Sequence, residues 1–263
     1  MSENPYSTCP VCGGNTKPVT YTLKAGHPKG KTMTGTQCIG CDLLRFPENT
    51  ASYLNVLENS EQERRLQERR NANAERPGRE FHMAQMCIET LTRFNASVSF
   101  FGAGINTDWQ WLQRAYPEVQ TKLVDLENMQ SVPHFETIAD ATPSDIVVAS
   151  EVIEHFEEPL AHFESLLRLV KEDGILICGT NLYNGKDISH DFYPFTPGHV
   201  TYWTPYALAY VGMQKGFFVD FRTPELYAVK GANKRYILFF KSPETIYRLG
   251  VYFGNHVHAP SEP

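Results

Sequence analysis

Val98-Ser-Phe-Phe-Gly-Ala-Gly104 is the stretch of sequence that decides the fold. Its apolar start, residues 98–101, is typical of a buried strand, and the glycines after it allow a sharp turn into a helix expected over 108–116. Missing side chains let a ligand touch the backbone, and the start of a helix offers unpaired amides. The stretch therefore predicts a nucleotide-type site at the end of a strand.

Strand and helix patterns alternate on both sides of this turn. A helix is expected before it, over 81–94, and strands are expected after it over 121–126 and 145–149. Further expected elements are a helix over 160–170, a strand over 175–178, a helix over 205–215, and strands over 217–221 and 236–241. Strands that alternate with helices predict an α/β fold with a mostly parallel sheet covered on both faces.

Composition divides the chain into four parts. Residues 1–47 hold four of the six cysteines and are expected to form a small ribbon, and residues 48–79 form a highly charged helical linker. Residues 80–245 are expected to form the α/β domain, and residues 246–263 a C-terminal tail. The length of 263 residues suits one such domain with a small appendage.

The overall charge argues against a surface made to bind nucleic acid. The formal net charge is −6, although a local basic patch stays compatible with it. The sequence has no apolar run long enough to span a membrane and no secretory signal, so we expect no membrane partner and a cytoplasmic protein.

Two pairs of cysteines have the spacing of a metal site. Cys9 and Cys12 form one CxxC pair, and Cys38 and Cys41 form the other. Zn²⁺ prefers four thiolates at tetrahedral corners, and two CxxC turns can supply them. Four cysteine ligands leave no open position, so the sequence predicts a structural zinc ribbon. The remaining pair, Cys87 and Cys178, lies on apolar elements and is expected to be buried.

Basic residues gather between the two cysteine pairs. They are Lys17, Lys24, His27, Lys29 and Lys31. The favoured interpretation is a solvated hairpin. The alternative is a surface that binds an anionic substrate.

An acidic residue follows the glycine turn at the distance that a ribose site requires. Asp125 ends the strand expected over 121–126 and lies 21 residues after Gly104. A carboxylate there can accept hydrogen bonds from both ribose hydroxyls. Tight strand–helix packing or a dinucleotide fold would show the same pair of features.

Longer segments resemble class I S-adenosylmethionine (SAM)-dependent methyltransferases, which have a Rossmann-like fold. Asp145-Ile-Val-Val-Ala-Ser-Glu-Val-Ile-Glu-His155 is similar to the family's fourth strand and the Glu-His pair after it. The segment from Leu166 to Ile177 resembles the next helix, its glycine turn and the fifth strand. Gly198-His-Val-Thr-Tyr-Trp-Thr204 and Lys215-Gly-Phe217 are similar to the family's C-terminal portion. The resemblance covers about residues 80–241.

The resemblance implies SAM as the cofactor and places its binding residues. They are Phe101, Gly102, Ala103, Gly104, Asp125, Leu126 and Ser150. The sequence departs from the family twice: Phe100 stands where the family has an acid that helps to hold the cofactor's amino group, and Asn106 stands where it has a third glycine. Two consequences stay open: a lower affinity for the cofactor, or Asp108 as a substitute for the missing acid.

Three residues after the fourth strand are catalytic candidates. Glu151, Glu154 and His155 would share one face of a helix that begins after Ser150. His155 is a candidate general base. The segment resembles the Glu-x-x-Glu-His segment of ubiquinone-pathway O-methyltransferases, which implies a divalent metal held by the same three residues. The bland alternative is that the two glutamates are solvated and His155 packs against the cofactor.

Polar and aromatic residues in the later loops are expected to contact the acceptor. They are Asn181, Tyr183, His190, His199 and Tyr202. Together these features predict methyl transfer to a small molecule such as a sugar or a polyketide. An RNA methyltransferase and a non-catalytic scaffold with the same fold are the alternatives. A nicotinamide oxidoreductase ranks below them, because Thr107 occupies the third glycine position of its fingerprint.

Overall fold

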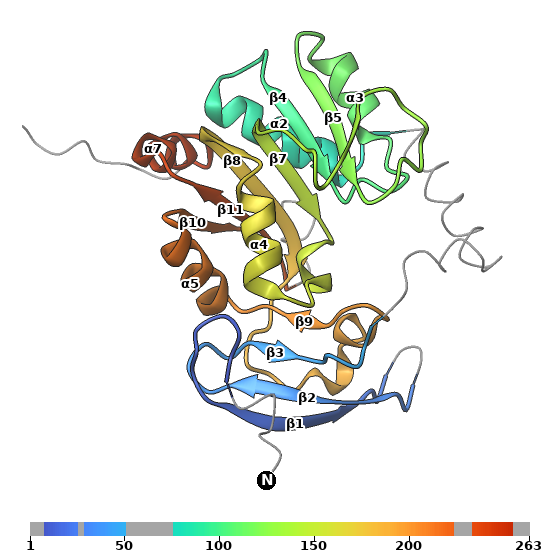
Figure 1. Cartoon of the computed structure of the whole chain (residues 1–263). Coiled ribbons are helices and arrows are strands. Elements are labelled where there is room, and N and C mark those ends of the chain that lie inside the picture. Colours follow the sequence, from blue (N-terminus) through green and yellow to red (C-terminus); the bar gives the residue numbers. More distant parts are fainter. Residues whose placement is uncertain (1–7, 26–28, 51–75, 224–232, 255–263) are drawn as a thin grey trace, which may run out of the picture.

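A seven-stranded sheet and a four-stranded sheet make up the fold in the computed structural model, which describes residues 8–25, 29–50, 76–223 and 233–254. The larger sheet has the strand order β10-β11-β8-β7-β4-β5-β6. The smaller sheet lies beyond one end of the larger sheet (Figure 1).

Five strands of the larger sheet are mutually parallel. They are β4 (Ser97–Phe101), β5 (Gln120–Asp125), β6 (Phe135–Thr137), β7 (Ser144–Ser150) and β8 (Val170–Asn181). β11 (Lys234–Phe240) runs antiparallel to β8, and the edge strand β10 (Phe218–Arg222) runs antiparallel to β11. The Rossmann-like α/β class predicted from the sequence is therefore confirmed.

Helices cover both faces of this sheet. One face carries α2 (Arg79–Leu91), α3 (Asp108–Ala115) and α7 (Pro243–Tyr252), and the other carries α4 (Pro159–Leu167) and α5 (Pro205–Lys215). Side chains of β7 alternate between the two cores, because successive residues of a strand point to opposite faces. All four apolar residues at 146–149 are buried, which explains the uninterrupted apolar run in the sequence.

The N-terminal ribbon folds as a short sheet. β1 (Thr16–Thr22) and β2 (Thr32–Cys38) form a hairpin, and β3 (Leu44–Arg45) pairs with β2. Gly35 is required in β2, because a Cβ atom there would lie 1.9 Å from the carbonyl oxygen of Arg45. The fourth strand, β9 (Thr201–Tyr202), comes from the α/β domain. The described part of the ribbon therefore shares its sheet with the α/β domain.

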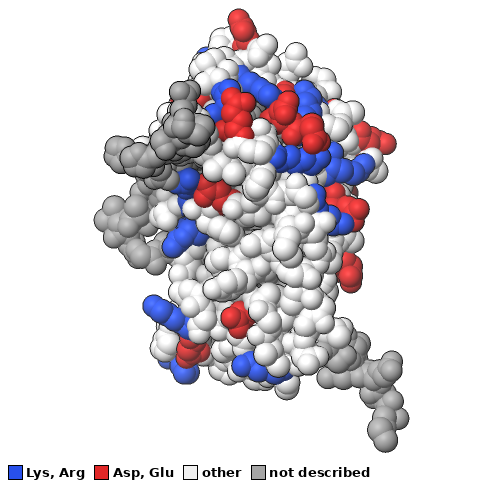
Figure 2. Space-filling view, turned by 90° about the vertical axis from the view of Figure 1, so that its left-hand side faces the viewer, with Lys and Arg blue, Asp and Glu red and all other residues white. Residues whose placement is uncertain are grey.

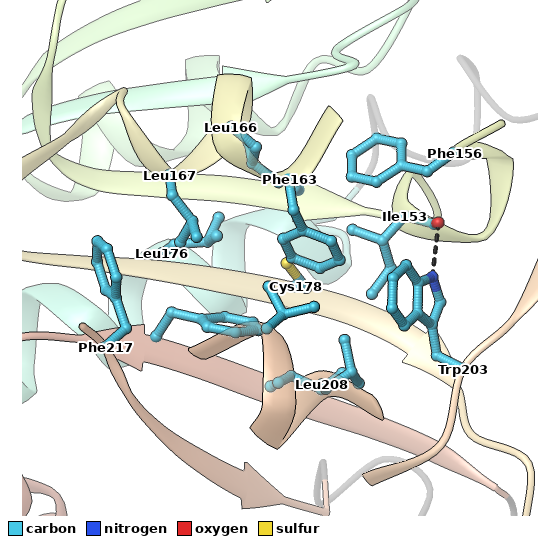
Figure 3. Close-up of a cluster of buried hydrophobic side chains, with 14 of the residues drawn as sticks. Ile153, Phe156, Phe163, Leu166, Leu167, Leu176, Cys178, Trp203, Leu208 and Phe217 are labelled. Atoms are coloured by element: carbon cyan, nitrogen blue, oxygen red, sulfur yellow. Dashed lines mark hydrogen bonds between the residues drawn. The ribbon is translucent and has the colours of Figure 1, made fainter. Parts of the chain in front are cut away.

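Buried aromatic side chains join the ribbon to the α/β domain. Trp203 follows β9 and packs edge-on against Phe163 of α4, and its Nε1 donates a 2.7 Å hydrogen bond to the carbonyl oxygen of Ile153 (Figure 3). Ribbon residues Val11 and Leu43 belong to the same cluster. The cluster makes the ribbon and the α/β domain one packed body.

Three short 3₁₀ helices lie in the loops beyond β7 and β8. They are η2 (Ile153–His155), η3 (Ile188–His190) and η4 (Tyr193–Phe195). Asn49, two residues after the ribbon, fixes the last of these loops, because its amide Nδ2 donates to the carbonyl oxygens of Pro194 in η4 and of Thr196 and His199 after it. The segment that leaves the ribbon thereby helps to set the position of His199.

The structure corrects the sequence expectations for one strand and for the C-terminal tail. The short strand β6 was not predicted, because three residues give too short a pattern. The tail expected over 246–263 is wrong at its start, since α7 continues to Tyr252 and packs on α2. Most of the charged linker expected over 48–79 lies outside the described residues. No helix in the described part of the chain is both long and apolar enough to cross a membrane.

Trp203→Ala should lower the free energy of unfolding by about 3–5 kcal/mol, because it removes a large buried ring and leaves a cavity. Urea denaturation followed by circular dichroism would measure the change. Phe192→Ala is the matched control, since that ring is 61% exposed and its loss should cost about 0.5 kcal/mol or less. Equal stability of the two variants would contradict the assigned role of Trp203.

Candidate active site

The strand order places the candidate site between β4 and β7. The chain proceeds from β4 outward to β5 and β6 and then returns to β7 on the other side of β4. In parallel sheets, such a reversal opens a crevice at the carboxyl ends of the strands, where ligands bind. The glycine turn after β4 and the segment from Glu151 to His155 after β7 meet at this edge.

The glycine turn has the backbone that its sequence predicts. Gly102 and Gly104 have φ angles of +66° and +50°, and a Cβ atom on Gly102 would lie 2.7 Å from Cγ2 of Val152. Asp125 accepts hydrogen bonds of 2.7 Å from the amides of both Gly104 and Leu126. These bonds hold the carboxylate of Asp125 beside the turn, as a ribose-binding residue requires.

A small hollow lies beside the turn. It has a volume of about 10 Å³ and is lined by Glu80, Phe100, Phe101, Gly102, Ala103, Asn106, Val148 and Ser150. Four of the predicted cofactor residues therefore border it, whereas Leu126 does not line it and has an exposed side chain. The buried hydroxyl of Ser150 has no hydrogen-bond partner among the described residues.

Asp108 does not replace the missing acid, so that expectation is wrong. Its buried carboxylate accepts hydrogen bonds from the amides of Gly78 (2.8 Å) and Phe81 (3.1 Å), at the start of α2. Burial and the nearby Glu80 raise the pKa of Asp108 to about 6. Asp108 is therefore a structural residue that caps a helix.

The acid that does face the glycine turn is Glu80, which sequence reasoning missed. Its carboxylate accepts a hydrogen bond from Nδ2 of Asn106, across the hollow. Arg79, its neighbour in α2, lies 3.5 Å from the same carboxylate and 3.1 Å from that of Glu151. No motif marks Glu80, because it precedes the first strand and only the fold brings it to the turn.

Glu151 is separated from Glu154 and His155, so the expected shared helix face is wrong. Glu151 has a φ angle of +55°, which interrupts any helix at this point. Its carboxylate pairs with Arg79 and with the buried Lys234 of β11. Burial is the main cause that lowers the pKa of Lys234 to about 7, and the positive charge of Arg79 adds to it.

Glu154 lies inside the protein, 1% exposed. Its carboxylate accepts hydrogen bonds from the hydroxyls of Tyr193 (2.5 Å) and Thr180 (3.1 Å). Burial raises the pKa of Glu154 to about 7, against the opposing effect of these hydrogen bonds. Both carboxylate oxygens therefore already have partners within the protein.

Two histidines lie beside Glu154. His155 Nδ1 is 2.8 Å from the carbonyl oxygen of Gly198, and its ring meets that of His199 edge-on at 4.8 Å. Burial lowers the pKa of both rings, and His155 contributes to lowering that of His199 to about 3. One ligand atom from each of Glu154, His155 and His199 lies within 4.8 Å of the other two. His199 thus takes the place in this cluster that the sequence analysis gave to Glu151.

The other predicted acceptor residues are divided between two places. Asn181 ends β8 next to Tyr193, whose hydroxyl is 3.4 Å from the Asn181 amide. Tyr183 and Tyr202 are buried in a cluster that joins the ribbon to the loop after β8. Tyr183 also borders a cavity of about 290 Å³ with Asp42 and Tyr206. His190 is exposed on η3. The backbone N–H of Lys24 donates a hydrogen bond to the carbonyl oxygen of Ser189 in the same helix.

The four ribbon cysteines lie together as predicted. The sulfur atoms of Cys9 and Cys41 are 3.7 Å apart, and those of Cys12 and Cys38 are 3.4 Å apart. Tetrahedral ligation with Zn–S bonds of about 2.3 Å requires roughly 3.8 Å between sulfurs. All four are free thiols, and the amides of Gly40 and Cys41 point at the sulfur of Cys38. The remaining cysteines, Cys87 and Cys178, are buried as expected.

The ribbon lysines give little support to an anion-binding surface. Lys31 donates to the side chain of Asn49 and to the carbonyl oxygen of Phe195, and Lys24 lies 3.7 Å from Asp187. His27 lies outside the described residues. On the face drawn in Figure 2, Lys and Arg are interspersed with Asp and Glu. Mixed charge of this kind creates no field of one sign.

The fold is a Rossmann-like α/β sheet with a small hollow at its switch point, beside the glycine turn. Residues 103–178 match the model of a family described as a methyltransferase domain. This match agrees with the resemblance seen in the sequence. No curated protein matches the sequence.

Solved structures agree with this fold. The pyocyanin biosynthetic protein PhzM is 15% identical, with a TM-score of 0.52 over 72% of this chain and 61% of its own. The plantazolicin methyltransferase BpumL, in complex with a pentazolic desmethylPZN analog and SAH, is 11% identical, with a TM-score of 0.51 over 74% of this chain and 97% of its own. For CalO1, a methyltransferase in calicheamicin biosynthesis, the match spans 55% of that chain.

Glu154→Gln should change how stability depends on pH. The pKa of Glu154 is raised from 4.5 to about 7, so between these values the folded protein holds a proton that the unfolded chain has lost. Stability from this group is therefore complete below pH 4.5 and lost as pH rises through 7. The stability of Glu154→Gln relative to wild type should rise by up to about 3 kcal/mol from pH 5 to 8.

Urea unfolding at several pH values would measure this difference. Glu118→Gln is the control, because Glu118 is exposed and its substitution should leave the pH dependence unchanged. If Glu154→Gln and wild type gave parallel curves, Glu154 would not be a buried, protonated carboxyl at pH 5.

Proposed function

We propose that this protein is a SAM-dependent methyltransferase that acts on a small-molecule acceptor and carries a structural zinc in its N-terminal ribbon. The observation that carries the proposal is the carboxylate of Asp125, held by the amides of Gly104 and Leu126 beside the glycine turn. This is the arrangement that a nucleoside needs, because the carboxylate faces the ribose while the turn admits the rest of the ligand.

The residues around the turn fit such a cofactor. Gly104 leaves open space, since a Cβ atom there would meet nothing within 4 Å. The unpartnered hydroxyl of Ser150 offers a further polar contact. We assign the ribose to Asp125, and the remaining contacts to Phe101, Gly102, Ala103, Gly104, Leu126 and Ser150. The 10 Å³ hollow holds about one water molecule, so the cofactor must displace the Glu80–Asn106 contact when it binds.

When bound, SAM supplies the electrophilic methyl group, and the protein aligns the acceptor with it. His155 is assigned as the base that removes the acceptor's proton. The carbonyl oxygen of Gly198 accepts a hydrogen bond from Nδ1–H, which leaves the lone pair on Nε2. Burial lowers the pKa of His155, so the ring is neutral and ready to accept a proton at pH 7.

Glu154 and His199 position His155 in this proposal. Thr180 and Tyr193 already donate hydrogen bonds to both oxygens of the buried Glu154 carboxylate. Glu154 therefore needs no metal ion as a partner, and we assign no step to a divalent metal. Glu151 acts with Arg79 and Lys234 at the cofactor side of the crevice. Asn181 is the remaining predicted acceptor residue at this edge of the sheet.

A small acceptor is favoured over RNA. The acceptor side of the crevice is formed by buried histidine and tyrosine side chains, and two of the ribbon lysines are engaged within the protein. Of the two proteins that share the fold, PhzM is named as a pyocyanin biosynthetic protein and BpumL as a plantazolicin methyltransferase. A non-catalytic scaffold remains the alternative and is distinguished by direct binding of SAM.

The zinc site is proposed to be structural. Cys9, Cys12, Cys38 and Cys41 supply four thiolates and leave no open position for substrate. The hydroxyl of Thr204, next to Trp203, donates to the carbonyl oxygen of Cys41. Zinc would therefore stabilise the ribbon and, through it, the loop that carries His199.

Asp125→Ala should weaken SAM binding by about 1–3 kcal/mol, because the ribose hydroxyls lose their charged acceptor. Isothermal titration calorimetry with wild type and variant would test this. Asp173→Ala is the control. Asp173 lies near the start of β8, at the end of the strand away from the glycine turn, and its side chain is exposed. Unchanged affinity in Asp125→Ala would place the cofactor elsewhere, and no SAM binding by wild type would reject the proposed function.

Cys38→Ala should abolish stable zinc binding, because three thiolates leave the tetrahedral shell incomplete. Metal analysis by inductively coupled plasma mass spectrometry should find about one zinc per chain in wild type and in the control Cys87→Ala. The thermal midpoint of Cys38→Ala should also fall, since metal binding and folding of the ribbon are coupled. Equal zinc content in the two variants would exclude the four-cysteine site.

A further inference from the structure

The class I family's acid before the glycine turn is absent from this chain, and the position cannot supply a charge. Phe100 occupies it, is 3% exposed, and packs in the core with Val98 and Leu123. A cofactor with an ammonium group therefore needs a carboxylate from another element. Among the residues that line the hollow beside the turn, Glu80 is the one carboxylate.

The orientation of Asn106 shows what Glu80 is placed to bind. Oδ1 of Asn106 accepts a 2.6 Å hydrogen bond from the backbone amide of Asp108, so the amide's NH₂ end faces Glu80. Glu80 thus already accepts a hydrogen bond from an N–H donor at the glycine turn. An ammonium group at the same place would be a stronger donor, because it carries a charge.

Arg79 places a cation beside this carboxylate. Its Nη2 lies 3.5 Å from Glu80, and its Nη1 lies 3.1 Å from Glu151. Its buried Nε finds no hydrogen-bond partner within the described part of the chain. A buried N–H without a partner is costly unless a ligand satisfies it.

Helix stability alone does not explain this pair. An acid in the first turn of a helix is favourable, but a cation there opposes the helix dipole. Arg79 is the first residue of α2, and its side chain is only 24% exposed. The pair therefore has the arrangement of a site for a ligand that carries both charges.

We propose that Glu80 and Arg79 bind the amino-acid end of SAM, with Glu80 accepting from its α-ammonium and Arg79 donating to its α-carboxylate. The inference rests on the proposed function. On binding, the ammonium replaces the Asn106 amide on Glu80, and the ligand's carboxylate satisfies the guanidinium.

The test compares two nucleosides that differ in this end of the molecule. S-adenosylhomocysteine keeps the amino acid, whereas 5′-methylthioadenosine lacks it. Calorimetry with the full chain should show that Glu80→Gln and Arg79→Gln each lower the affinity for S-adenosylhomocysteine about ten- to hundredfold. Affinity for 5′-methylthioadenosine should change less than about twofold, and the control Glu118→Gln should change neither.

The outcomes separate this inference from the proposed function. Equal weakening of both nucleosides would show that Glu80 and Arg79 only support the fold, and unchanged binding of both would remove them from the site. Either result overturns the inference but leaves the nucleoside crevice in place. If wild type bound neither nucleoside, the proposed function would fail as well. Thermal melts of each variant would establish that it is folded, and the two variants test the pair independently.

Discussion

The parallel pairing of β4 with β7 is the constraint on which the rest of the structure depends. It places residues 98–101 beside residues 146–149, although the two segments are almost fifty positions apart in sequence. The glycine turn and the segment from Glu151 to His155 leave the sheet next to each other as a result. Without this pairing, the proposed cofactor residues and the proposed acceptor residues would not meet, so the strand order itself brings the candidate site together.

The acceptor side depends on a second constraint, which comes from the ribbon. β9 pairs with β3, and Asn49 holds the backbone of η4 and of the residues that follow it. These contacts fix His199 and Tyr193 over the end of β8, where Tyr193 meets Glu154. The ribbon supports a loop that has little regular structure of its own, and the proposed zinc would make this support more rigid. The ribbon is thus a part of the acceptor site's scaffold and not a separate module.

The sequence predicted the regular parts of this fold well. The strands around the glycine turn and the helix over 205–215 have clear apolar periods, so their positions were confirmed. β6 was missed because it is too short to show a period. α7 was also missed, and it follows the interior strand β11 in a segment expected to be a tail. The four cysteines were recognisable because their ligand chemistry is local in sequence.

The site was less predictable, because its charges meet only in the folded chain. Glu151, Glu154 and His155 suggested one helix face, but the left-handed backbone of Glu151 sends its carboxylate to Arg79 instead. No sequence motif includes Glu80, so its position beside the glycine turn was not predicted. Long-range pairings of this kind depend on the tertiary structure, which local patterns do not encode.

Energetics explain why these charges matter for function. Glu151 has a backbone conformation that costs a residue other than glycine on the order of 1–3 kcal/mol, and Lys234 is buried enough that its charged form is disfavoured. A hydrophobic replacement of such a buried ion pair is often neutral or stabilising. Strain and buried charge therefore coincide at the end of β7, beside the glycine turn. Stability does not require this combination, whereas a crevice that must hold a charged nucleoside in one orientation does.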